Sequence, residues 1–118
     1  KLGSVAFEGV YSFATRFEEQ PGTNPEEFVG AALSGCFSMF LAAQLNNAGY
    51  PPNQIRTNAR VHLGEGPTIT LVELYTQAQV PNLTEEDLKK HADIAKKNCP
   101  VSKALIGPEV TLGVQLLK

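Results

Sequence analysis

The sequence predicts an α+β domain with a mainly antiparallel sheet and a long, buried central helix. Three features indicate this class: an uncharged run of 18 residues in a helical stretch, two alternating segments joined by a Gly-Pro turn, and a final alternating segment. The order of strands, long helix, hairpin, helices and strand is typical of α+β proteins. A chain of 118 residues suits one core. No linker or repeat divides it, so residues 1–118 are expected to form a single domain.

The first 22 residues hold short apolar pieces broken by Gly3 and Gly9. They predict one or two short strands, followed by a loop that contains Arg16. The chain does not begin with Met, which leaves room for residues upstream of Lys1.

The central helix is expected over residues 24–48. Asn24 is a good N-cap, Pro25 suits the first helical position, and Glu27 completes a start that resembles a capping box. Gly49 and the prolines that follow it end the helix.

The segment Phe28–Leu45 inside this helix carries no charge. A membrane span needs about 20 apolar residues, but glycines, serines and a glutamine dilute this run, so a core helix is the simpler interpretation. A domain of this size cannot cover such a helix on every side. We therefore expect a partner subunit to cover part of it, and small residues would allow the close approach: Gly30, Ala31, Ala32, Ser34 and Gly35.

The second half of the chain predicts a hairpin, two helices and a last strand. Alternation after Arg56 and again over Thr68–Val80 gives the hairpin, and a change of apolar phase between Leu71 and Val72 indicates a bulge. Thr84 and Pro100 each start a helix. One apolar stripe and one alternating strand complete this part, namely Leu88, Ala92 and Ala95, with Ile94 beside the stripe, and then Val110, Leu112, Val114 and Leu116.

Charge and motifs exclude several functions. The net charge is −2 and the pI about 5.6, so no basic excess exists for nucleic acid or for an anionic membrane. His62 and His91 do not form ligand spacings with the cysteines, so no metal site is expected. The chain has no P-loop, GxGxxG or GxSxG motif. No basic-then-apolar signal peptide opens it, and we expect a cytoplasmic location.

Two cysteines, Cys36 and Cys99, are the only ones in the chain. From the residues alone they are inert core thiols, a structural bridge or a redox couple. Cys36 lies within the apolar helix, where a free cysteine is usually a packing residue. Cys99 precedes Pro100, which places it at a helix N-terminus that favours a thiolate. Arg16 is a candidate cation for activating a thiol, and Glu26 could orient it through a bidentate pair.

Four motifs occur in order along the chain: Thr15-Arg16-Phe17-Glu18, Gly22-Thr23-Asn24-Pro25-Glu26-Glu27, Gly35-Cys36-Phe37-Ser38-Met39 and Asn98-Cys99-Pro100-Val101-Ser102. Together they resemble the osmotically inducible protein C family, the OsmC branch of the OsmC/Ohr superfamily of organic hydroperoxide reductases. The match runs from Thr15 to Lys118. The stretch before the arginine is shorter than in family members.

This resemblance implies an intertwined homodimer with long central helices between sheets and active sites at the subunit interface. It also implies that Cys36 is the peroxidatic cysteine, Cys99 the resolving cysteine, Arg16 the catalytic arginine and Glu26 the glutamate that holds it. Glu26 and Cys36 share one helix, about 15 Å apart along its axis and roughly 80° apart around it. We therefore expect Arg16 and Glu26 to reach Cys36 from the partner chain.

The expected reaction is reduction of a hydroperoxide, with a Cys36 sulfenic acid and a Cys36–Cys99 disulfide as intermediates. An external dithiol, either a lipoyl-bearing protein or a small thiol, would then reduce the disulfide. No prosthetic group is needed. Apolar neighbours favour organic over hydrogen peroxide, and the expected substrate-binding residues are Phe28, Phe37, Met39 and Phe40.

Two other functions compete with this hypothesis. One is a non-catalytic α+β dimer that binds a hydrophobic ligand and uses its cysteines for packing. The other is a thiol–disulfide oxidoreductase, whose usual CxxC motif is absent.

Overall fold

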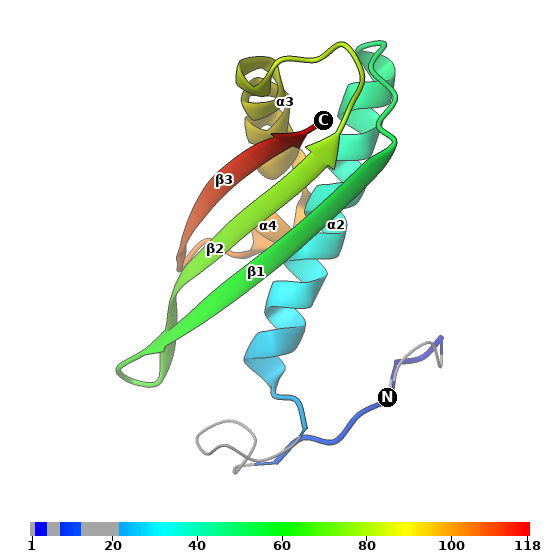
Figure 1. Cartoon of the computed structure of the whole chain (residues 1–118). Coiled ribbons are helices and arrows are strands. Elements are labelled where there is room, and N and C mark those ends of the chain that lie inside the picture. Colours follow the sequence, from blue (N-terminus) through cyan, green and yellow to red (C-terminus); the bar gives the residue numbers. More distant parts are fainter. Residues whose placement is uncertain (1, 5–7, 13–21) are drawn as a thin grey trace.

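The computed structural model describes residues 2–4, 8–12 and 22–118. Within them, a long helix precedes a hairpin, two helices and a last strand (Figure 1). The elements in chain order are α2 (Pro25–Asn47), β1 (Gln54–Gly64), β2 (Thr68–Gln79), α3 (Glu85–Asn98), α4 (Pro100–Ala104) and β3 (Glu109–Leu117). The predicted α+β class and the predicted order of these elements are confirmed.

The three strands form one mixed sheet in the order β1-β2-β3. β1 and β2 make the predicted antiparallel hairpin, whereas β3 lies parallel to β2. The parallel direction follows from the connection, because α3 and α4 return the chain to the end of the sheet at which β2 begins (Figure 1). The bulge differs from the prediction by one position: His62 pairs with Leu71 and Leu63 with Ile69, so Thr70 is the extra residue.

The helices pack against one face of the sheet (Figure 1). That face carries the inward side chains of β2, which alternate with polar residues on the other face. The core consists mainly of aliphatic residues from β2 and the helices, with Phe37 at its centre. Its fully buried members are Leu33, Phe37, Leu41, Leu45, Val72, Ala78, Leu88, Ala92 and Cys99.

Helix α2 begins as the sequence predicts. Asn24 is the N-cap, and its side chain accepts a hydrogen bond from the backbone N–H of Glu27, at 2.9 Å. The Thr23 hydroxyl donates to the Glu27 carboxylate. The helix ends before Gly49, whose φ of 88° is a conformation that glycine adopts without strain.

By length and composition, α2 could cross a membrane, with a mean hydropathy of 1.6 in its most apolar window. In this structure one of its faces packs against the sheet and α3, with Leu33, Phe37, Leu41 and Leu45 buried. We interpret α2 as the core helix of the domain. Its opposite face is exposed and apolar, and includes Met39, of which 73% is accessible.

Charged side chains of α3 bind the outer edge of β3. Lys96 Nζ donates to the carbonyl of Val110 at 2.8 Å, and Lys89 Nζ donates to the carbonyl of Leu112 at 3.4 Å. The backbone N–H of Leu116 donates to a carboxylate oxygen of Glu85 at 3.3 Å. These contacts hold α3 beside β3 and occupy backbone groups that an edge strand would otherwise leave unpaired.

The strands expected in the first 22 residues lie mostly outside the described residues. The described part of this stretch contains one isolated parallel bridge, between Tyr11 and Thr23.

Candidate active site

Cys99 lies at the joint between α3 and α4, and its side chain is fully buried. Its backbone N–H donates to the carbonyl of Ala95 at 3.0 Å and closes α3. Its Sγ accepts the backbone N–H of Ser102 at 3.5 Å and caps α4. The sequence predicts this N-cap position from Pro100, which occupies the first position of α4.

Cys36 lies in the middle of α2 and is half-buried. Its side chain lies beside that of Cys99, where α2 contacts α4. The fold therefore brings together two thiols that are 63 positions apart in the chain. Both cysteines are free.

The environment of Cys99 favours its protonated form. Burial raises the pKa of the Cys99 thiol, and the neighbouring Cys36 side chain raises the pKa further. The backbone N–H groups of Ser102 and Val101 act in the opposite direction. A buried thiol that keeps its proton is a poor nucleophile. Cys36, which solvent can reach, is better placed than Cys99 to meet a substrate first.

The expected arginine, Arg16, lies outside the described residues. Glu26, its expected partner, is half-buried in the first turn of α2. It borders a cavity of about 450 Å³ between the start of α2 and β1, which Arg60 also lines. Ten helical residues separate Glu26 from Cys36, about 15 Å along the axis, so one chain does not bring these two side chains together.

The four expected substrate-binding residues lie in different environments along α2. Phe37 is fully buried in the core, so its placement favours packing over contact with a ligand. Met39 and Phe40 are exposed, to 73% and 38%. Phe28 is half-buried at the other end of the helix.

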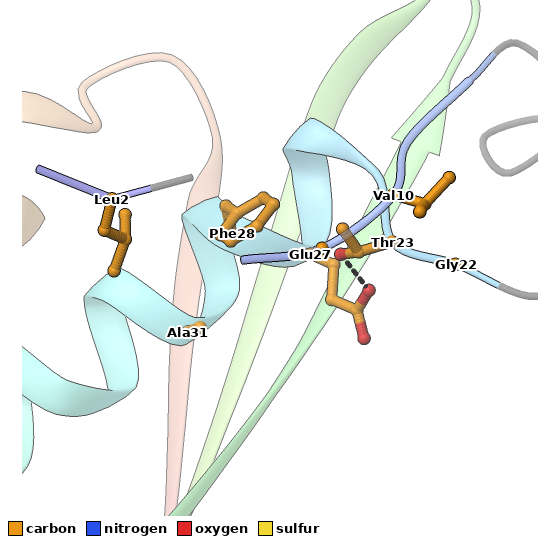
Figure 2. A pocket seen from close by; sticks show the side chains of 8 residues that line it. Leu2, Val10, Gly22, Thr23, Glu27, Phe28 and Ala31 are labelled. Atoms are coloured by element: carbon orange, nitrogen blue, oxygen red, sulfur yellow. Dashed lines mark hydrogen bonds between the residues drawn. The ribbon is translucent and has the colours of Figure 1, made fainter. Parts of the chain in front are cut away.

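A mainly apolar cavity of about 570 Å³ lies at the N-terminal end of α2. Leu2, Val10 and Phe28 line it together with Glu27, whose carboxylate accepts the Thr23 hydroxyl (Figure 2). Neither cysteine lines this cavity. Phe28 is eight residues from Cys36, about 12 Å along the helix, so the cavity is separate from the thiol pair within one chain.

Metal chemistry has no candidate site in the described part of the chain. No group of three or more His, Cys, Asp or Glu side chains gathers there. His62 contacts Glu73 on the outer face of the sheet, and His91 contacts Gln44 between α3 and α2, at 3.1 Å.

One feature near Cys36 escaped the sequence analysis. The hydroxyls of Ser38, Thr57 and Thr76 are hydrogen-bonded in series between α2 and the sheet. The signal available in the sequence was threonine at two inward positions of alternating strands, where an aliphatic residue is the norm.

A helix-backed mixed sheet, with two thiols in contact between α2 and the α3–α4 joint, defines an α+β protein with a paired-thiol site. A model of the OsmC-like protein family matches residues 17–114. The chain therefore belongs to this family, as its motifs predict.

Individual relatives agree with this assignment. The chain is 43% identical over 109 residues to peroxiredoxin OsmC of Escherichia coli, covering 90% of this chain and 76% of that protein. An OsmC-like protein of Vibrio cholerae superposes with a TM-score of 0.71 at 24% identity, covering 79% of this chain and 64% of that protein. The organic hydroperoxide resistance protein OhrB of Bacillus subtilis superposes with a TM-score of 0.70 at 21% identity, covering 90% and 80%. The two superpositions show a shared fold.

Proposed function

We propose that this protein is a two-cysteine thiol peroxidase that reduces organic hydroperoxides, and hydrogen peroxide less well, to alcohols and water. The observation that carries the proposal is the contact between half-buried Cys36 and buried Cys99. The relationship to a peroxiredoxin at 43% identity supports a peroxidase-like role.

In the proposed cycle the Cys36 thiolate attacks the outer oxygen of the hydroperoxide. The O–O bond breaks, the leaving alkoxide takes a proton to give the alcohol, and Cys36 becomes a sulfenic acid. The Cys99 sulfur then attacks the Cys36 sulfur. An S–S bond forms, and the hydroxyl leaves as water with the proton that Cys99 gives up. An external dithiol exchanges with this disulfide, becomes oxidised itself and restores both thiols.

Arg16 and Glu26 complete the proposed site from a second copy of the chain. Arg16 would stabilise the thiolate and the charge on the leaving oxygen, with its guanidinium held by Glu26. Since Glu26 and Cys36 of one chain are about 15 Å apart, the homodimer is the proposed unit of function.

The exposed face of α2 supports this dimer. Ala32, Gly35, Met39 and Ala43 are all exposed and follow one another at helical spacing, so they form one narrow apolar stripe. A Cβ added at Gly35 would meet nothing within 4 Å. Small residues in a stripe permit the close approach of a second helix.

Apolar residues in and beside this stripe support the proposed preference for organic peroxides. Met39 and Phe40 lie three and four residues after Cys36, one helical turn away, and both are exposed. Together with Phe28 they would offer apolar surface to an alkyl group at the interface. We also propose that a lipoyl-bearing protein or a small thiol reduces the disulfide and so regenerates the two thiols. The proposed location is the cytoplasm, because that compartment keeps thiols reduced.

Titration of the thiols with one equivalent of cumene hydroperoxide tests the proposal. We expect prompt loss of two thiols per chain in the wild type and no loss in Cys36→Ser. Cys99→Ser should lose one thiol and yield a sulfenic acid that dimedone traps. Two unreactive thiols in the wild type would instead support the non-catalytic function. Loss of the remaining Cys99 thiol in Cys36→Ser would contradict the assigned order of attack.

A further inference from the structure

Three hydroxyl groups form one hydrogen-bonded chain from α2 into the core. Ser38 Oγ donates to Thr57 Oγ1 at 2.6 Å, and Thr57 Oγ1 lies 2.9 Å from Thr76 Oγ1. Thr76 Oγ1 donates to the carbonyl oxygen of Arg56 at 3.4 Å. Thr76 has no accessible surface and is the one polar residue that is fully buried among the described residues.

The last acceptor of this hydroxyl chain determines which hydroxyl donates in each hydrogen bond. The Arg56 carbonyl can only accept, so the Thr76 hydroxyl uses its proton there, Thr57 donates to Thr76, and Ser38 donates to Thr57. Each hydroxyl has a single proton, so each bond depends on the next one. Removal of one member would leave a neighbouring hydroxyl, buried or half-buried, without one of its partners, which folded proteins avoid.

The hydroxyl chain attaches α2 to the sheet close to Cys36. Ser38 follows Cys36 by two residues, about 3 Å along the axis and roughly 200° around it. The hydroxyl chain therefore binds one side of the helical turn whose other side carries the thiol.

Gly30 provides a second attachment of α2 to β1. A Cβ at this position would lie 3.0 Å from Val61 Cγ2 and 3.4 Å from the Ala59 Cβ, so the helix backbone contacts the strand closely. Gly30 and Ser38 are eight residues apart, about 12 Å. Contact at Gly30 limits the distance between helix and sheet, and the directional bonds at Ser38 limit sliding and rotation.

We propose that the Ser38–Thr57–Thr76 chain is a positioning device for Cys36, which fixes the register of α2 on the sheet and thereby the geometry in which Cys36 meets Cys99. Disulfide formation tolerates little error, because the two Cβ atoms must lie about 3.5–4.5 Å apart with a dihedral angle near 90°. A shift of α2 by about 1 Å would move Cys36 out of this range. The role in catalysis rests on the proposed function, whereas the positioning itself can be measured without peroxide.

The equilibrium between the reduced protein and its Cys36–Cys99 disulfide in glutathione redox buffers tests this inference. That equilibrium gives the effective concentration of one thiol at the other. Thr76→Val keeps the shape of the side chain and removes the hydroxyl, and we expect the effective concentration to fall roughly ten-fold. Thr76→Ser keeps the hydroxyl and loses a methyl group, and we expect a change of less than about two-fold.

Ile69→Ala is the matched control for general destabilisation. Ile69 packs against the core near the start of β2, seven residues before Thr76 and away from the hydroxyl chain. Its truncation should lower the unfolding midpoint and leave the effective concentration unchanged. If Thr76→Val does not fold, Ser38→Ala replaces it as the test at the other end of the hydroxyl chain. The same fall in effective concentration is expected.

The outcomes separate the two proposals. A folded Thr76→Val protein with the wild-type effective concentration, or an equal fall in Ile69→Ala, would overturn the positioning role. If cumene hydroperoxide leaves both thiols of the wild type intact while Thr76→Val still lowers the effective concentration, the peroxidase proposal fails and the positioning role stands.

Discussion

Cys99 makes hydrogen bonds to the backbone of two helices, and its thiol lies beside Cys36. Its N–H closes α3 and its sulfur caps α4, so the side chain has little freedom to turn away. Burial and the neighbouring Cys36 side chain raise its pKa, which favours the protonated thiol. In the proposed cycle this arrangement reserves the first attack for Cys36.

The raised pKa of Cys99 predicts a loss of stability at alkaline pH. A group whose pKa is raised by folding contributes stability that is fully present below its unfolded pKa, about 8.5 for a thiol, and is lost as the pH rises through the folded value. The free energy of unfolding of the reduced protein should therefore fall with rising pH across this range. Urea unfolding at a series of pH values, with a reductant present, measures it.

Cys99→Ser is the control for this prediction, since serine does not titrate there. Its free energy of unfolding should fall less steeply with pH than that of the wild type. Parallel curves for the two proteins would mean that folding does not raise the pKa of this thiol.

At the scale of elements, the two glycines of α2 should respond in opposite ways to alanine. At Gly35 a Cβ meets open space, so Gly35→Ala should raise the free energy of unfolding by up to about 1 kcal/mol through helix propensity. At Gly30 the Cβ would press on Val61, and overpacking costs about 1–3 kcal/mol. Gly30→Ala should therefore lower the free energy of unfolding.

Urea unfolding measures the free energy of unfolding of both variants. The protein concentration is kept the same throughout, because association of copies adds to apparent stability. Equal gains from the two alanines would show that α2 does not approach β1 as closely as the structure indicates.

The elements could be predicted from the sequence because their signals are local. Asn24, Thr84 and Pro100 start helices at the expected residues, and alternation locates every described strand. The parallel direction of β3 could not be predicted, because alternation is the same in both directions. Thr70 as the extra residue depends on pairing across two strands, which a phase shift along one strand locates only approximately.

The residues of the proposed site could be named from the sequence, but the contacts between them could not. The motifs indicate which cysteines matter, whereas the proximity of Cys36 and Cys99 depends on how α2 packs against the α3–α4 joint. The hydroxyl chain involves Ser38 and Thr76, 38 positions apart, and nothing in the local sequence connects them. For Phe37, its place beside Cys36 in the sequence predicts substrate contact, whereas its side chain is fully buried in the core.

At the scale of the whole molecule, a large residue at Gly35 should separate the proposed dimer without unfolding the chain. A side chain there points into open space in one copy, so Gly35→Leu should fold as a monomer. Since Arg16 and Glu26 are proposed to come from the partner, its peroxidase activity should fall by about a hundred-fold, the scale at which misplaced groups act. Light scattering and peroxide consumption measure the two effects.

Gly107→Leu is the matched control. Gly107 also has nothing within 4 Å of an added Cβ, and it lies in the exposed loop after α4. This variant should keep both the mass and the activity of the wild type. A Gly35→Leu protein that stays dimeric, or a verified monomer with full activity, would contradict the proposed dimer.

The charged side chains along β3 also limit how such molecules can assemble. Lys96, Lys89 and Glu85 occupy backbone groups on that edge, and no comparable set covers β1 within the described part of the chain. Polymerisation by strand addition needs two open edges in each copy, one to receive a strand and one to offer. A sheet with only one open edge can pair with one other copy, and no further copy can then add to it. We therefore expect the contacts that hold α3 beside β3 to oppose fibre formation by strand addition.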